Sequence, residues 1–294
     1  MALIIEAARR ILTIVFGGAA STTGVLSAVT DTGTSQTITV GFKGPAFPSR
    51  ITATAGGTSG DIKAITVSVT GTAPGGAVIT ETLPAFTVDT PGTVTGSYVF
   101  ETVTSVTIPA HDGTGATTSI GYAGSPKVAT TTGIHAAVTD TGVQQVVTTA
   151  IMQPDVPRNI TATAGGTAGD IKAIQVVIAG TNAEDVAISE TLPAFTVDTA
   201  GTVQGSKAFK TVTSITIPAH DNTGATTAIG FGEKLGIGLR LARNTVKGAY
   251  LAETVEGTAP TVVVDATNLE GNTADLNSAL NSTQVKLEVI PTSN

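Results

Sequence analysis

The chain of 294 residues contains three histidines, and two of them occupy equivalent places in a motif that could bind a metal ion. His111 and His220 each end the run Ile-Pro-Ala-His, and Asp112 and Asp221 follow them. Adjacent residues of a strand point to opposite faces, and no further histidine or cysteine stands at a ligand spacing, so each pair falls short of a metal site. The motif instead predicts a turn in which the aspartate side chain caps backbone N–H groups.

Aspartates recur near the predicted turns, where their carboxylates could bind Ca²⁺. The calcium-loop pattern of alternating acidic ligands that ends in a bidentate glutamate is missing. Aspartate is also a common turn former, and this role is the favoured one. The residues concerned are Asp31, Asp61, Asp89 and Asp112 with their counterparts Asp140, Asp170, Asp198 and Asp221.

Catalytic patterns are missing from the sequence. A glycosidase needs two carboxylates across a cleft, but Glu81 and Glu190 occupy equivalent strands, and Glu101 is replaced by Lys210 in the second half of the chain. The chain has no cysteine and no Gly-x-Ser-x-Gly elbow, and its glycine-rich stretches join strands to strands rather than opening a helix that could hold phosphate. We therefore expect no enzymatic activity and no catalytic, cofactor-binding or metal-binding residues.

Charge argues against a nucleic-acid partner, because the net charge is -7 and such proteins present a positive field to phosphates. Basic residues gather only at Arg9-Arg10 and in the cluster Lys234, Arg240, Arg243 and Lys247. A solvated face is the favoured interpretation of the cluster, and a surface for an acidic partner is the alternative. No uncharged apolar stretch of about 18 residues predicts a membrane helix, and the N-terminal residues lack the pattern of a secretory signal.

Aromatic residues make up only 4% of the chain, and tryptophan is missing, so a platform for stacking sugars is not predicted. Tyr98 and Phe231 are the two candidates for contact with a host glycan. Packing in the core is the favoured role for both.

One unit of about 100 residues is present twice. Residues 51–122 align without a gap to residues 160–231, and about 51 of these 72 positions are identical. The register extends back to Thr22 and Thr131, and His135 stands where the first unit has Leu26. The predicted organisation is an N-terminal segment (1–21), repeat 1 (22–122), a linker (123–130), repeat 2 (131–231) and a C-terminal region (232–294).

Each repeat alternates apolar and polar residues with the period of a half-buried strand. Ile65, Val67 and Val69 are apolar, and Ile174, Val176 and Ile178 keep this face in repeat 2. Turn-forming clusters separate short strands, which together predict an all-β protein with two tandem immunoglobulin-like β-sandwiches. The strands expected in repeat 1 are 36–42, 50–55, 62–70, 78–83, 96–108 and 116–122.

The two regions outside the repeats are too poor in apolar residues to fold alone. We expect the N-terminal segment to pair with the C-terminal region in a third, small β-domain. A short helix is predicted at Thr273–Leu280, because Thr273 can cap it and Asp275 suits its first turn.

The repeats resemble modules of virion structural proteins from tailed bacteriophages. The resemblance is carried by residues 194–203 (AFTVDTAGTV) and 205–218 (GSKAFKTVTSITIP), covers both repeats, and extends to the ending Asp275–Asn281 (DLNSALN). It brings no active-site motif with it, so no functional residue is carried over.

This resemblance implies a structural protein that is made in the host cytoplasm and ends in the virion. Capsid decoration, in which the protein binds the major capsid protein or other virion proteins and stiffens the shell, is the leading expectation. A head or tail fibre component that touches host glycans is the alternative, and a bacterial surface adhesin is less favoured. Repeated weak contacts favour a homo-oligomer, and a trimer would suit a capsid threefold position or a fibre.

Overall fold

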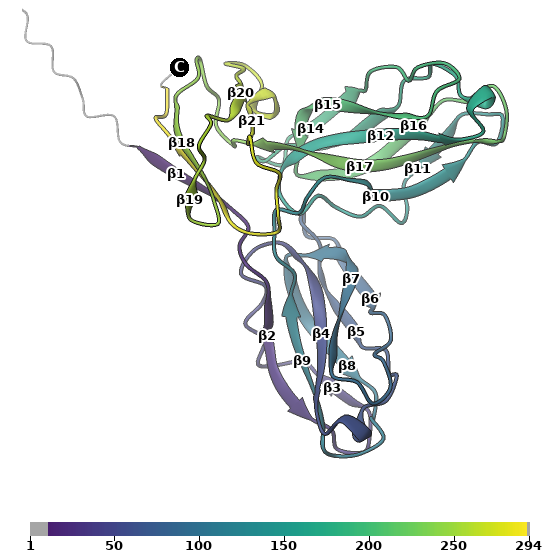
Figure 1. Ribbon diagram of the computed structural model, residues 1–294, viewed down its shortest axis with the longest axis vertical. Helices are drawn as coiled ribbons and strands as arrows, with labels where there is room; N and C mark the ends of the chain where they lie inside the picture. Colours follow the sequence, from purple (N-terminus) through teal and green to yellow (C-terminus); the bar gives the residue numbers. More distant parts are fainter. Residues whose placement is uncertain (1–10, 293–294) are drawn as a thin grey trace, which may run out of the picture. The chain divides into compact units, whose positions relative to one another are not determined.

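The computed structural model describes residues 11–292, and strands form its regular structure apart from three single-turn 3-10 helices. These strands gather in two compact units, a first unit of Gly17–Lys127 and a second unit that combines the chain up to Phe16 with the chain from Val128 onward (Figure 1). The predicted all-β class is confirmed. Among the described residues, no helix has the length and apolar character needed to cross a membrane.

The first unit is a sandwich of two antiparallel four-stranded sheets that contains repeat 1. One sheet has the order β2 (Ser21–Thr30), β9 (Ala116–Tyr122), β4 (Ser49–Gly57) and β7 (Gly92–Phe100). The other has the order β3 (Gln36–Ile38), β8 (Thr102–Ile108), β5 (Ser68–Thr72) and β6 (Val78–Thr82). Ile51, Phe100 and Val106 are among the fully buried side chains between the sheets.

Repeat 2 builds the same sandwich within the second unit. One sheet contains β10 (Thr130–Thr139), β17 (Ala225–Gly236), β12 (Arg158–Gly166) and β15 (Gly201–Phe209). The other has the order β11 (Gln145–Val147), β16 (Thr211–Ile217), β13 (Val177–Thr181) and β14 (Ala187–Thr191). Ile160, Phe209 and Ile215 fill its core at the places that Ile51, Phe100 and Val106 fill in repeat 1.

The predicted alternation is present, because Ile65, Val67 and Val69 are all buried between more exposed neighbours. The strand predicted at 62–70 nevertheless begins only at Ser68, as β5. Its first half bonds irregularly, since the carbonyls of Val67 and Ile65 accept from Leu83 and Phe86. Pro84 between these two donors has no N–H, so a regular ladder cannot continue there.

The single strand predicted at 96–108 is two strands in different sheets. β7 ends at Phe100 and β8 begins at Thr102, and Val99 and Phe100 are both buried where the chain crosses between the sheets. Two consecutive buried residues are incompatible with a strand that has one solvated face. β3 is shorter than the strand predicted at 36–42. β2 was not predicted, because its residues do not alternate between buried and exposed positions.

A third sheet joins the two ends of the chain in the second unit. Its order is β1 (Leu12–Phe16), β22 (Val285–Val289), β18 (Val246–Leu251) and β19 (Thr254–Val255). β1 pairs antiparallel with β22, from Leu12 opposite Val289 to Phe16 opposite Val285. Phe16 and Leu287 pack with Leu235 in a core of their own, which neither end of the chain could build alone.

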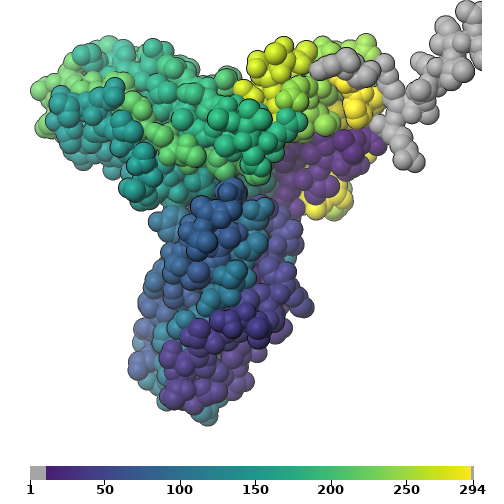
Figure 2. Space-filling model, turned by 180° about the vertical axis from the view of Figure 1, so that it is seen from behind, coloured from purple at the N-terminus to yellow at the C-terminus, as the bar shows by residue number. Residues whose placement is uncertain are grey.

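Repeat 2 continues into the C-terminal region without a break at residue 231. β17 runs on to Gly236, where it pairs with β21 (Thr273–Asp275), and β21 pairs in turn with β20 (Thr261–Val263). In Figure 2 the surface passes from the teal and green of repeat 2 to the yellow of the C-terminal region. The helix predicted at Thr273–Leu280 is wrong, because Thr273 and Ala274 are buried between two strands and their backbones are held in the sheet.

Candidate functional site

The histidine of each repeat is buried in a hydrogen-bond network at one end of its sandwich. The Nδ1 atom of His111 accepts the backbone N–H of Lys63 at 3.2 Å, and its Nε2 atom lies 2.9 Å from Thr118 Oγ1. The ring stacks on Phe86 with centroids 6.1 Å apart. Because Nδ1 accepts, the ring is neutral and its proton is on Nε2, which donates to the threonine.

Repeat 2 reproduces this network at His220. Its Nδ1 atom accepts from Lys172 at 3.1 Å, Nε2 lies 2.9 Å from Thr227 Oγ1, and the ring stacks on Phe195 at 6.0 Å. A neutral imidazole with both nitrogens engaged by the protein has no free position for a metal ion or a substrate proton. The network therefore acts as a structural lock between the segments that it joins.

The predicted turn is present, but a different aspartate caps it. Asp31 Oδ1 accepts the backbone N–H of His111 at 3.0 Å, and its Oδ2 accepts that of Gly33 at 2.7 Å. Asp112 instead faces solvent and lies 3.3 Å from the Lys63 ammonium. Asp140 and Asp221 take the same two roles in repeat 2. The capping residue lies far away in the sequence, which a local motif cannot reveal.

The histidine lock predicts that acid weakens the fold. Burial lowers the pKa of His111 and His220 below the ordinary value of 6.5, against the opposing effect of nearby aspartates. Below pH 6.5 the unfolded chain therefore binds more protons than the folded chain. The contribution of the two neutral histidines to the free energy of unfolding is fully present above pH 6.5 and is lost as the pH falls below it. We expect the free energy of unfolding to fall with pH in this range, and the variant His111→Asn/His220→Asn to show a flatter profile in denaturant titrations.

His135 supplies the control for this prediction. Its ring lies 2.8 Å from the neighbouring carbonyl of Ala136, outside both buried networks, so the same titrations on His135→Asn separate the loss of a histidine from the loss of a network. A profile that stays equally steep after both buried histidines are replaced would contradict the prediction.

Glu81 and Glu190 clamp a bulge in the opposite sheet. Glu81 on β6 accepts the N–H groups of Ser97 and Tyr98 on β7, and Glu190 accepts the N–H groups of Ser206 and Lys207 on β15. Burial raises the pKa of Glu81, and the two N–H donors oppose that shift. A Cβ atom at the neighbouring Gly96 would lie 2.4 Å from the Glu81 carboxylate, so the clamp requires glycine there.

The two glutamates sit in separate sandwiches, and each is bound to backbone within its own. The remaining candidate aspartates also have local roles: Asp61 Oδ2 accepts from Gly115 at 3.0 Å, and Asp89 adopts a turn conformation with φ of 53°. Within residues 11–292, no group of three histidine, aspartate or glutamate side chains is arranged to hold a metal ion.

Among the basic residues of the C-terminal region, Arg240, Arg243 and Lys247 are exposed and Lys234 is half-buried. The guanidinium of Arg240 makes a two-pronged contact with Glu184 of repeat 2, at 2.9 and 3.3 Å. Arg9-Arg10 lies outside the described residues. The two candidate aromatics contact cores, because Tyr98 packs against that of repeat 1 and Phe231 is 1% exposed.

A group of polar contacts joins repeat 2 to the C-terminal region. Asn182 donates to the buried Glu270 at 3.2 Å, and the ammonium of Lys207 lies 3.6 Å from the same carboxylate. The equivalents of Asn182 and Lys207 in repeat 1 are Ala73 and Tyr98, which cannot make these contacts. Substitutions that separate the two repeats thus add polar contacts to the docking of the C-terminal region on repeat 2, where β17 also pairs with β21.

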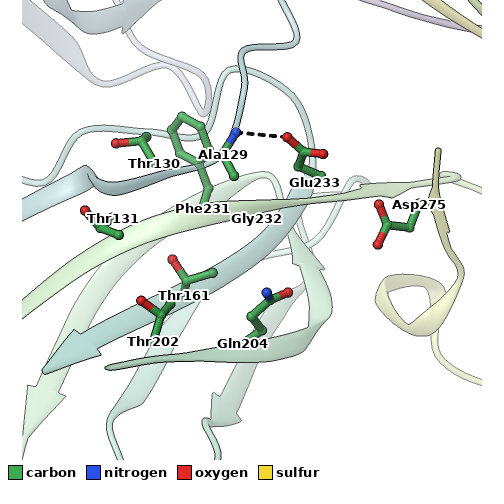
Figure 3. A pocket seen from close by; sticks show the side chains of 10 residues that line it. All are labelled: Ala129, Thr130, Thr131, Thr161, Thr202, Gln204, Phe231, Gly232, Glu233 and Asp275. Carbon is green, nitrogen blue, oxygen red and sulfur yellow. Dashed lines mark hydrogen bonds between the residues drawn. The ribbon is translucent and has the colours of Figure 1, made fainter. Parts of the chain in front are cut away.

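A pocket of about 600 Å³ lies in the second unit, over the sheet of repeat 2 and beside β21 (Figure 3). Four threonine hydroxyls, one amide and two carboxylates supply most of its polar groups. Its lining consists of Ala129, Thr130, Thr131, Thr161, Thr202, Gln204, Phe231, Gly232, Glu233 and Asp275.

The sequence did not single out this pocket. Asp275 comes from outside the repeat, and only the pairing of β21 with β17 brings it to Glu233. One signal was available: repeat 1 has Thr95 and Gly124 where repeat 2 has Gln204 and Glu233, so these two polar groups of the lining are specific to repeat 2. No protein-family model matches the chain, and no curated protein matches it.

Proposed function

We propose that this chain is a structural protein of a tailed-bacteriophage particle that decorates the capsid as a homo-oligomer and has no catalytic activity. The observation that carries the proposal is that the histidine and glutamate side chains considered for catalysis are hydrogen-bonded to the protein itself. His111, His220, Glu81 and Glu190 all hold backbone segments together. The resemblance of both repeats to phage virion modules is the reason for proposing a bacteriophage particle as the location.

The exposed sheet faces favour extended protein contacts. Threonine hydroxyls pair across neighbouring strands, as in Thr70 with Thr80 at 2.9 Å and Thr72 with Thr102 at 2.7 Å. Such short side chains lose less conformational entropy on association than lysine or glutamate. A surface of this kind can dock repeatedly on a symmetric shell, where many weak contacts add up.

Sheet edges offer a second means of association. Val78 on the edge strand β6 is 77% exposed, and Val146 on the edge strand β11 is 57% exposed. An open edge can be extended by a strand of a neighbouring protein. The partners in this proposal are the major capsid protein, other virion proteins and further copies of the chain.

A count of copies per particle tests the proposal. Quantitative mass spectrometry of purified particles should give a fixed, high ratio of this chain to the major capsid protein, because decoration follows the capsomers. A few copies per particle, together with loss of host adsorption when the chain is deleted, would overturn decoration in favour of a fibre.

A further inference from the structure

An amine, a carboxamide and a carboxylate meet where the C-terminal region docks on repeat 2. Asn182 follows β13 and is 3% exposed, and Lys207 belongs to β15. Glu270 is 7% exposed and belongs to the 3-10 helix η3 (Leu269–Gly271), which lies against β15. Nδ2 of Asn182 donates to Oε2 of Glu270 at 3.2 Å, and Nζ of Lys207 lies 3.6 Å from Oε1. One buried carboxylate therefore holds the amine and the carboxamide on its two oxygens.

The side-chain carbonyl of Asn182 is polarised by the backbone around it. Its Oδ1 atom accepts the N–H groups of Glu184 and Val186, at 3.0 and 3.1 Å. Two N–H donors on one carbonyl oxygen draw electron density from the carbon and stabilise the oxyanion that forms when a nucleophile adds to it. The same two bonds hold the turn between β13 and β14, so the carboxamide is fixed in place.

Lys207 supplies a nucleophile for this carbonyl. Its ammonium donates to the Ser189 carbonyl at 3.0 Å, and the flexible four-carbon stem allows Nζ to swing from there toward the carboxamide. A carboxylate in contact with both nitrogens can take a proton from the amine and pass one to the nitrogen that leaves. The cluster thus contains the groups needed to join a lysine to an asparagine through an amide bond.

We propose that Lys207 and Asn182 react with each other, with Glu270 as the general acid and base, and form an isopeptide bond that crosslinks the two sheets of repeat 2. Glu270 takes one proton from the Lys207 ammonium, and the neutral Nζ attacks Cγ of Asn182. The Nζ–Cγ bond forms, Glu270 passes its proton to Nδ2, the Cγ–Nδ2 bond breaks, and ammonia leaves. Nζ then gives its second extra proton through Glu270 to the ammonia, so the products are a secondary amide and an ammonium ion.

This inference goes beyond the proposed function and does not depend on it. The reaction happens once in each chain and has no turnover, so it is compatible with a structural protein that acts on no substrate. Repeat 1 has Ala73 and Tyr98 at the equivalent positions and cannot form the bond. In repeat 2 the bond would tie the hairpin of β13 and β14 to β15 covalently.

The mass of the full-length chain tests the inference. Mass spectrometry of the intact protein should give one ammonia less than the sequence predicts. Digestion with trypsin and a glutamate-specific protease should leave fragments 173–184 and 191–210 joined, because a crosslinked Lys207 is no longer a cleavage site. A cyclic imide at an asparagine also loses ammonia, but it leaves these two fragments separate. The full mass, or a loss of ammonia with separate fragments, would overturn the inference.

Variants assign the roles of the three side chains. Lys207→Arg and Glu270→Gln should both keep the full mass, because the first lacks the amine and the second cannot take up its proton. Lys210→Arg is the matched control: Lys210 follows the same strand and lies 2.8 Å from the exposed Asp185, so its replacement should leave the two fragments joined.

The mass of the unaltered protein decides the question even if a variant fails to fold. Loss of ammonia that persists in Lys207→Arg would overturn the inference, and joined fragments at the wild-type yield in Glu270→Gln would overturn the role given to Glu270. A chain without the crosslink that still decorates particles would leave the proposed function standing, whereas a crosslinked chain that binds no particle would refute the function alone.

Discussion

Replacing Arg158 by serine, the residue at the equivalent Ser49 of repeat 1, is expected to lower the free energy of unfolding of the second unit by about 3–5 kcal/mol. Arg158 is fully buried, and its Nη1 atom lies 2.9 Å from Asp155 Oδ1. Its Nε atom donates to the Gly232 carbonyl at 2.8 Å, and its guanidinium lies over Phe231. The substitution leaves the carboxylate of Asp155 buried without this counter-charge.

Repeat 1 supplies the control for this prediction, since it has Ala46 and Ser49 at the places of Asp155 and Arg158. The double variant Asp155→Ala/Arg158→Ser should recover part of the lost stability, because it removes the buried charge as well. Ser49→Ala should cost little, as the Ser49 hydroxyl has no hydrogen-bond partner within residues 11–292. Denaturant unfolding measures all three, with hydrogen exchange at β12 for the two Arg158 variants and at β4 for Ser49→Ala. A single variant that costs less than about 1 kcal/mol would contradict the account.

Replacing Asn272 by leucine is expected to destabilise the C-terminal region by about 3 kcal/mol or more, although the two side chains are similar in size. The fully buried Asn272 Oδ1 accepts the N–H groups of Leu241 and Asp265 at 3.0 and 2.9 Å. Its Nδ2 donates to the carbonyls of Asp265 and Asn268 at 2.7 and 2.8 Å. Leucine would leave these backbone groups unsatisfied.

Hydrogen exchange gives the readout for this variant. The amides of Leu241 and Asp265 should exchange much faster in Asn272→Leu, while amides of β4 in the first unit keep their wild-type rates. Asn268→Ala is the matched control, because its exposed side chain donates a single hydrogen bond, to Asp265, among the described residues, and the expected cost is about 1 kcal/mol. Unchanged protection of Leu241 in the leucine variant would refute the proposed role of Asn272.

Local patterns were sufficient for the fold class and for the repeated sandwich. The alternation at Ile65, Val67 and Val69 depends only on which face of a strand is buried, and all three side chains are buried. The first and last residues of the strands were harder to predict from the sequence, because they depend on which other strands pair with them. β17 extends past residue 231 since β21 pairs with its end, and the same pairing replaces the helix predicted at Thr273–Leu280.

The candidate functional side chains also divide into what the sequence predicted and what it could not predict. The sequence predicted a capped turn at His111, but the cap is Asp31, which is 80 residues away in the sequence and lies beside the turn because β2 pairs with β9. It also could not place Asp275 beside Glu233, because that contact exists only when the C-terminal region docks on repeat 2. In both cases the residue types could be interpreted from the sequence, whereas the long-range contacts could not be predicted from it.

We propose that these sandwiches serve as a scaffold on the surface of a shell. Rebinding of the purified full-length chain to capsids from which it has been stripped tests that claim most directly. The account predicts saturable binding at a fixed ratio to the capsomers, with a rise in the temperature at which the shells break open. Shells that take up none of the chain, and break open at the same temperature with and without it, would contradict the account.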